Sequence, residues 1–164
     1  MIFRLTQKLA KKIHSLDTLN DLPLAGNPFA DWSANLFRAR RLQYIIVTNT
    51  VSLYSMLLNG RGIADNDDFI IGVRSTLRLF MEADGNDVLY RKYIETDDTP
   101  EMFAKSLNRS VNGSMNDFIE KAKYHLEYSE LSLYDTAQRL NEMPMSYLNL
   151  DNPKIAFSAM ASKK

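Results

Sequence analysis

The residues best suited to hold a ligand are grouped at the start of a helical pattern late in the chain. Asn108, Arg109 and Ser110 are consecutive, and Ser114 follows one helical turn later. The start of a helix offers unpaired N–H groups and a partial positive charge, and arginine adds a forked donor for an anion. Asn108, Arg109, Ser110 and Ser114 are therefore a candidate site for a small anion.

Helix capping explains most of the same residues without a ligand. Asn112 or Ser114 is a suitable N-cap, and Asp117 follows Ser114 at the spacing of a capping box. Caps are the commoner role of such residues, and both explanations stay open. The chain has neither of the glycine-rich phosphate-loop patterns, GxxxxGKS/T and GxGxxG.

A second candidate surface lies on a stretch rich in β-branched and aromatic residues. A polar, aromatic-edged surface for a small ligand or a protein partner would be formed there by Asn35, Arg38 and Trp32, with Arg40 and Arg41 nearby. The structural alternative places Trp32 in the core and uses the arginines to protect a loop or a sheet edge.

Three lysines near the N-terminus raise the same question of phosphate binding. Lys8, Lys11 and Lys12 share one face of a predicted helix. In a chain with zero net charge, a solvated helix face is the simpler explanation.

No catalytic residue, metal site or cofactor is predicted. Cysteine is absent, and the two histidines, His14 and His125, do not occur in an HxH or HExxH pattern. No serine or aspartate is placed beside either histidine in the manner of a catalytic triad. Whether the protein is an enzyme is left open.

Composition sets the class of protein. A chain of 164 residues with 45% hydrophobic and 24% charged residues is typical of one globular domain, here 1–164. Its twenty basic and twenty acidic residues cancel, so nucleic acid is not indicated as a partner. The apolar runs are too short to span a membrane, no signal peptide is evident, and we expect a cytoplasmic protein.

The segment 27–62 predicts a three-stranded antiparallel meander. Apolar and polar residues alternate over 32–37, as in a half-buried strand. The run 44–48 is β-branched or aromatic, as expected of a strand covered on both faces. A third strand is predicted at 53–58, and Tyr54 and Met56 on it would support a homodimer if that edge is uncovered.

The elements on either side follow from periodicity and capping residues. Residues 2–5 predict a strand, and Thr6 caps a short helix. A long connection, 14–28, follows; such loops are often functional, although its leucines would also fit along the edge of the core. Residues 102–106 predict an edge strand or a helical turn. Helical patterns occupy 65–85, 87–94, 108–128 and 130–142, with a weak one around 155–157, and 162–164 are expected to fray.

These elements predict an α+β fold. We expect one mostly antiparallel sheet of four or five strands with the meander at its centre and helices chiefly on one face. Residues 1–26 would supply the first strand, helix and loop, and 63–160 would be mainly helical.

Three stretches of the chain resemble an uncharacterised family of small bacterial proteins, described as a domain of unknown function. They are NPFADWSANLF, YIIVTNTVSLYS and NRSVNGSMNDF. The opening MIFRLTQKLAKKI and the later RLNEMPMSYL extend the resemblance over most of the chain. It implies no substrate, cofactor or catalytic residue. Because the sequence shows no recognisable catalytic or metal constellation, we expect a non-catalytic binding or regulatory module of the bacterial cytoplasm. The alternative is a small enzyme or ligand-binding protein for a phosphorylated or carboxylated molecule, held at the helix start after Asn108.

Overall fold

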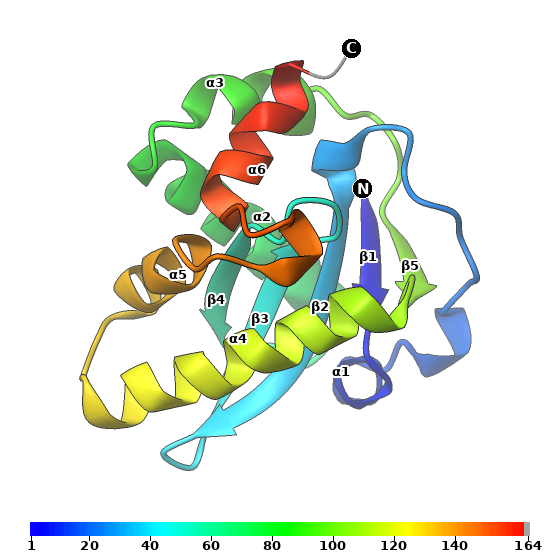
Figure 1. Ribbon diagram of the computed structural model, residues 1–164. Coiled ribbons are helices and arrows are strands. Elements are labelled where there is room, and N and C mark those ends of the chain that lie inside the picture. Colours follow the sequence, from blue (N-terminus) through cyan, green and yellow to red (C-terminus); the bar gives the residue numbers. More distant parts are fainter. Residues whose placement is uncertain (163–164) are drawn as a thin grey trace.

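Five strands form one mixed sheet in the computed structural model, which describes residues 1–162 (Figure 1). They are β1 (Ile2–Leu5), β2 (Asp31–Ala39), β3 (Leu42–Asn49), β4 (Ser55–Asn59) and β5 (Met102–Lys105), in the spatial order β4-β3-β2-β1-β5. β1 is parallel to β2 and β5, whereas the longer β2–β3 and β3–β4 ladders are antiparallel. The predicted α+β class with its meander is confirmed.

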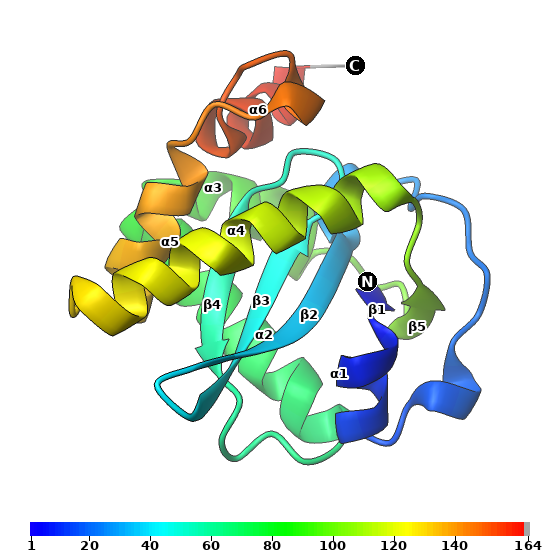
Figure 2. The same ribbon diagram turned by 60° about the horizontal axis from the view of Figure 1, so that its bottom comes forward.

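The helices cover both faces of the sheet, and not chiefly one face as the sequence suggested (Figures 1 and 2). The described residues form α1 (Gln7–Lys12), α2 (Asn66–Ala83), α3 (Asp87–Tyr90), α4 (Arg109–Tyr128), α5 (Leu133–Asn141) and α6 (Pro153–Ala159). α2 lies on one face, and α4 crosses the other. The predicted fraying at the C-terminus falls largely on 163–164, which lie outside the described residues.

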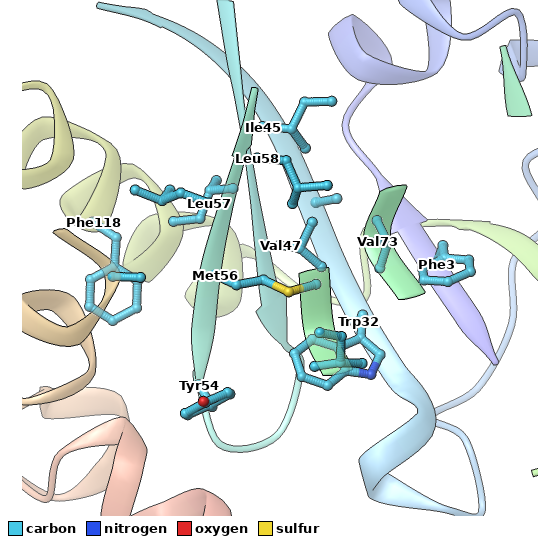
Figure 3. Close-up of a cluster of buried hydrophobic side chains, with 14 of the residues drawn as sticks. Phe3, Trp32, Ile45, Val47, Tyr54, Met56, Leu57, Leu58, Val73 and Phe118 are labelled. Carbon is cyan, nitrogen blue, oxygen red and sulfur yellow. The ribbon is translucent and has the colours of Figure 1, made fainter. Parts of the chain in front are cut away.

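Burial of the sheet on both sides explains this arrangement. Val47 and Leu58 point toward Val73 of α2, whereas Leu57 points to the opposite side, where Phe118 of α4 lies (Figure 3). All of these side chains are 5% exposed or less. A strand that is apolar on both faces needs cover on both faces, so helices on one side would leave half of it in water.

Local capping fixes where the long helix α2 begins and ends. Asp65 accepts a hydrogen bond from the N–H of Asp68 at 2.9 Å at the start of α2. At its other end Gly85 has a φ of +73°, with bonds from Gly85 N–H to Glu82 and from Asn86 N–H to Met81. These are the two bonds of a Schellman motif, which suits glycine because it lacks a Cβ.

The third strand of the meander starts two residues later than predicted. Leu53 has a φ of +62°, so it belongs to the turn that Asn49 organises by accepting a bond from the N–H of Ser52 at 2.9 Å. β4 is then paired at its outer edge by a side chain of α5. Asn141 accepts from the N–H of Ser55 at 2.7 Å and donates to its C=O at 2.9 Å.

This pairing bears on the homodimer expected through the third strand. Tyr54 and Met56 are both 0% exposed. Because α5 covers the edge beside them, they are not available to a second copy. A homodimer through another surface stays a prediction.

A buried ion pair attaches the long 14–28 connection to the sheet. The guanidinium of Arg4 on β1 forms a two-pronged bond with the carboxylate of Asp31 on β2, at 2.7 and 2.8 Å, and both side chains are at most 1% exposed. Arg4 also donates to the carbonyls of Leu22 and Pro23, and Asp31 accepts from the N–H of Ala25. The connection is thus ordered by two side chains of the sheet.

We expect Arg4→Met to lower the free energy of unfolding by about 3–5 kcal/mol, because Asp31 would remain buried without its cation. Replacing both charges, as in Arg4→Met with Asp31→Leu, should cost less than the sum of the single changes. Urea unfolding of the three variants measures this coupling. Strictly additive losses would show that the two side chains do not act as a pair.

Candidate functional site

β2 is longer than β1, and this difference leaves one side of β2 without a neighbouring strand. β1 pairs with β2 only over Asp31 to Ala34. After Leu5 the chain turns into α1, where the hydroxyl of Thr6 caps the helix. Residues 35–38 of β2 therefore have β3 on one side and, within residues 1–162, no strand on the other.

The space beside this half of β2 is an open groove of about 370 Å³, which we call the β2 groove. α1 and α4 border it, and α4 is seen crossing the sheet in Figures 1 and 2. Its lining residues are Lys8 of α1, Asn35, Leu36, Phe37 and Arg38 of β2, and Asn116, Ile119, Glu120 and Lys123 of α4.

Positive charge dominates the β2 groove. Lys8 and Arg38 are exposed, and within residues 1–162 neither forms an ion pair. Lys123 is paired with Glu120 at 2.9 Å, in the one exposed ion pair of the groove lining. The groove lining thus has three cations and one carboxylate. A negatively charged ligand would be attracted to this concave surface.

Side-chain amides add neutral donors to the groove. The carbonyl oxygen of Asn35 accepts a bond from the hydroxyl of Thr6 at 2.9 Å, and this bond orients the amide. The NH₂ group of Asn35 has no partner within residues 1–162, and Asn116 is exposed on the facing wall. These groups are suited to donate to a carboxylate, a phosphate or a peptide carbonyl.

The structure brings together some of the predicted site residues and separates others. Asn35 and Arg38 share the β2 groove, and Lys8, noted from the sequence for its charge, joins them. Trp32 does not: it is 0% exposed, and its indole N–H donates to the carbonyl of Phe29 at 2.9 Å. Trp32 therefore belongs to the core, which was the structural alternative.

At the start of α4 the polar groups bond within the helix itself. The helix begins at Arg109, so the expected N-cap, Asn112 or Ser114, is wrong; Asn108 accepts from the N–H of Val111 at 2.9 Å. The earlier start buries Val111, which is 1% exposed. The hydroxyl of Ser114 donates to the carbonyl of Ser110 at 3.0 Å, and Arg109 is exposed. An anion site here stays a prediction.

A cluster around Asp84, at the end of α2, was not anticipated from the sequence. Its carboxylate is fully buried and accepts bonds from the hydroxyls of Tyr54 and Tyr134 and from the amide of Gln138. Lys154 of α6 lies 4.0 Å away. The cluster connects α2 to the turn before β4, to α5 and to α6, so we assign it a structural role. Only tertiary contacts between distant segments reveal it.

Burial, followed by the hydrogen bond to Asp84, raises the pKa of both tyrosines. The pKa of Tyr134 rises to about 12, and the pKa of Tyr54 rises well above its usual value of 10. Both effects favour the neutral hydroxyl, which donates to a carboxylate in a way that a phenolate cannot.

Two further findings concern metal binding and membranes. In the part of the chain that the structure describes, no three metal-ligating side chains of His, Cys, Asp or Glu gather as a metal site would require. The helices of residues 1–162 include none that is both long and apolar enough to cross a bilayer.

We expect Arg109→Ala to change the free energy of unfolding by no more than about 0.5 kcal/mol, as exposed substitutions usually do. If the start of α4 does bind an anion, phosphate should stabilise the wild type by RT ln(1 + [L]/Kd), and this gain should vanish in the variant. Melting curves of both proteins across a phosphate titration decide the matter. A flat titration for both proteins would remove Arg109 from the candidate residues.

The Asp84 cluster predicts a loss of stability at alkaline pH. An unfolded tyrosine loses its proton near pH 10, before the folded Tyr54 and Tyr134, so the free energy of unfolding should fall as pH rises from about 10 toward 12. Tyr54→Phe with Tyr134→Phe should flatten this fall, and at neutral pH Tyr54→Phe alone should cost about 1.5–3 kcal/mol, because a buried carboxylate loses a donor. Urea midpoints from about pH 7 to 12 measure both effects.

Tyr124→Phe is the matched control for this experiment, since Tyr124 is 58% exposed on α4. It should leave the pH dependence unchanged. An equal flattening in the control would show that the alkaline loss does not come from the Asp84 cluster.

The comparisons with known proteins agree with the resemblance noted from the sequence. Neither the search of curated proteins nor the search of solved structures gave a match. A family model described as a domain of unknown function, DUF6933, matches residues 2–156, which is nearly the whole chain. Because the match runs through the sheet and all six α-helices up to the middle of α6, the chain belongs to the DUF6933 family.

Proposed function

We propose that the protein is a non-catalytic binding or regulatory module that holds a negatively charged part of its ligand in the β2 groove. The observation that carries this proposal is the set of cations Lys8, Arg38 and Lys123 around one concave surface, opposed by Glu120 alone. Two side-chain amides among the same residues can donate to the ligand. The absence of cysteine from the sequence supports a reducing cytoplasm as its location.

The β2 groove is a better candidate than the start of α4 for two physical reasons. It is concave and draws donors from three separate elements, which is how small-molecule and peptide sites are usually built. At the start of α4, in contrast, the side chains of Asn108 and Ser114 bond to their own helix. An anion there would meet the exposed residues 108–110, Arg109 among them.

Citrate is a suitable probe, because it presents three carboxylates without resembling any particular partner. We expect it to shift the backbone NMR signals of Lys8, Asn35, Arg38 and Lys123, and to do so less at high salt, where exposed charges are screened. Lys8→Glu should weaken the binding roughly tenfold, because it replaces an attraction by a repulsion of similar size.

Lys11→Glu makes the same charge change one helical turn along α1, at an exposed residue that does not line the groove. It controls for the change in net charge and should weaken binding far less than Lys8→Glu. If both variants lose the same affinity, or if the shifts spread evenly over the surface, the β2 groove is not the binding site.

A further inference from the structure

The backbone of β2 beside the groove carries hydrogen-bonding groups that point away from β3. The carbonyl of Ala34 accepts from the N–H of Thr6 at 3.2 Å, so it points to the β1 side of the strand. Residues two apart in a strand direct their backbone groups to the same side. Leu36 and Arg38 therefore direct theirs to the side that β1 would occupy if it continued.

The bonds of β3 support the same assignment. Gln43, opposite Arg38, accepts from the N–H of Gly60 on the far side of β3, and Asn49, opposite Trp32, donates to Tyr54. Both pairs are thus non-hydrogen-bonded pairs of the β2–β3 ladder. Leu36 lies between Trp32 and Arg38 at the same two-residue spacing, so its pair with β3 is of the same kind.

Four backbone groups of β2 consequently lack a hydrogen-bond partner in the described part of the chain. Within residues 1–162, the N–H and C=O groups of Leu36 and Arg38 have no hydrogen-bond partner. The other free side of the meander differs, because Asn141 pairs with Ser55 on β4. The β2 groove thus contains a short sheet edge without a partner strand among the described residues, at the exposed Arg38 and at Leu36, which is 6% exposed. Such edges pair readily with an extended chain.

We propose that an extended acidic peptide of a partner protein binds in the β2 groove and adds a strand beside Leu36 and Arg38. The peptide would continue the line of β1, with main-chain bonds to β2 and carboxylates on the surrounding cations, a known mode of peptide recognition. This proposal rests on the proposed function and adds the kind of ligand to it.

The arrangement of charge favours acidic side chains on both faces of such a peptide. Successive side chains of an extended chain point to opposite faces. Arg38 shares a face with Gln43, to which Lys12 of α1 donates at 3.0 Å, so Arg38 lies on the α1 side. Lys123 comes from α4 on the other wall. Consecutive glutamates or aspartates would therefore each meet a cation.

The same charges disfavour a second copy of this chain as the occupant. Two copies joined edge to edge through β2 would bring their Arg38 side chains and the surrounding lysines together. Like charges at such a contact oppose association. A peptide of opposite charge satisfies both the backbone edge and the cations.

The test compares two capped hexaglutamate peptides, one with ordinary amides and one N-methylated at every backbone nitrogen. Both carry the same carboxylates, but only the first can donate main-chain hydrogen bonds. We expect the ordinary peptide to bind roughly tenfold more tightly, as the loss of one or two such bonds implies. It should also slow hydrogen exchange at the amides of Leu36 and Arg38.

The outcomes separate this proposal from the one on which it rests. Equal affinity of the two peptides would overturn strand addition and leave an anion-binding groove. Binding by neither peptide at low salt would overturn both proposals. Protection of Leu36 and Arg38 that depends on protein concentration, without peptide, would identify a second copy as the occupant and would also overturn strand addition.

Variants of the protein at Arg38 also test whether the peptide adds a strand to β2. Arg38→Pro removes the outward-pointing N–H, which a free sheet edge tolerates because no ladder bond is lost. Arg38→Ala removes only the side chain and is the matched control. Arg38→Pro should bind the ordinary peptide several-fold more weakly than Arg38→Ala, while circular dichroism shows both folded. If Arg38→Pro does not fold, the peptide pair still decides the question.

Discussion

The buried pair of Arg4 and Asp31 is the interaction on which the architecture depends most directly. It joins β1 to β2 at the centre of the sheet, and its remaining donors and acceptors hold the backbone of Leu22, Pro23 and Ala25. A charge buried in this way is tolerable only when it is paired and fully hydrogen-bonded. The path of the long connection is therefore set by its backbone bonds to this ion pair, and its leucines are not what fixes it.

The short β1 that carries Arg4 also determines where the sheet stays open. Because Thr6 caps α1 immediately after β1, no strand of residues 1–162 pairs with β2 on this side from residue 35 onward, and α1 lies beside it instead. At the other side of the meander, α5 provides Asn141 to complete the outermost strand. Open edges favour unwanted association, so proteins usually cover them. The acidic peptide that we propose would cover this edge and meet the cations around it.

Much of the fold could be predicted from the sequence, because local residue patterns determine most of its strands and helices. Alternation identified the meander, β-branched residues identified β3, and Gly85 marked the end of α2. The errors have local physical causes as well. Leu53 adopts a left-handed conformation that its residue type does not suggest. The N-cap of α4 is Asn108 in place of Asn112 or Ser114, which puts the buried Val111 in the first turn. The apolar run 44–48 already indicated cover on both faces of β3. Which helices provide that cover depends on how they pack, which periodicity does not specify.

The site divides in the same way between sequence and tertiary structure. The sequence by itself determined the chemical inventory: no cysteine, two histidines, and balanced charge with local basic residues such as Lys8 and Arg38. Only the tertiary structure decided that Lys8, Arg38 and Lys123 face one groove, and that Trp32 does not. It likewise joined Asp84 to Tyr54 and Tyr134. Such convergence depends on strand lengths, register and helix placement, and these are set by packing between segments far apart in the chain.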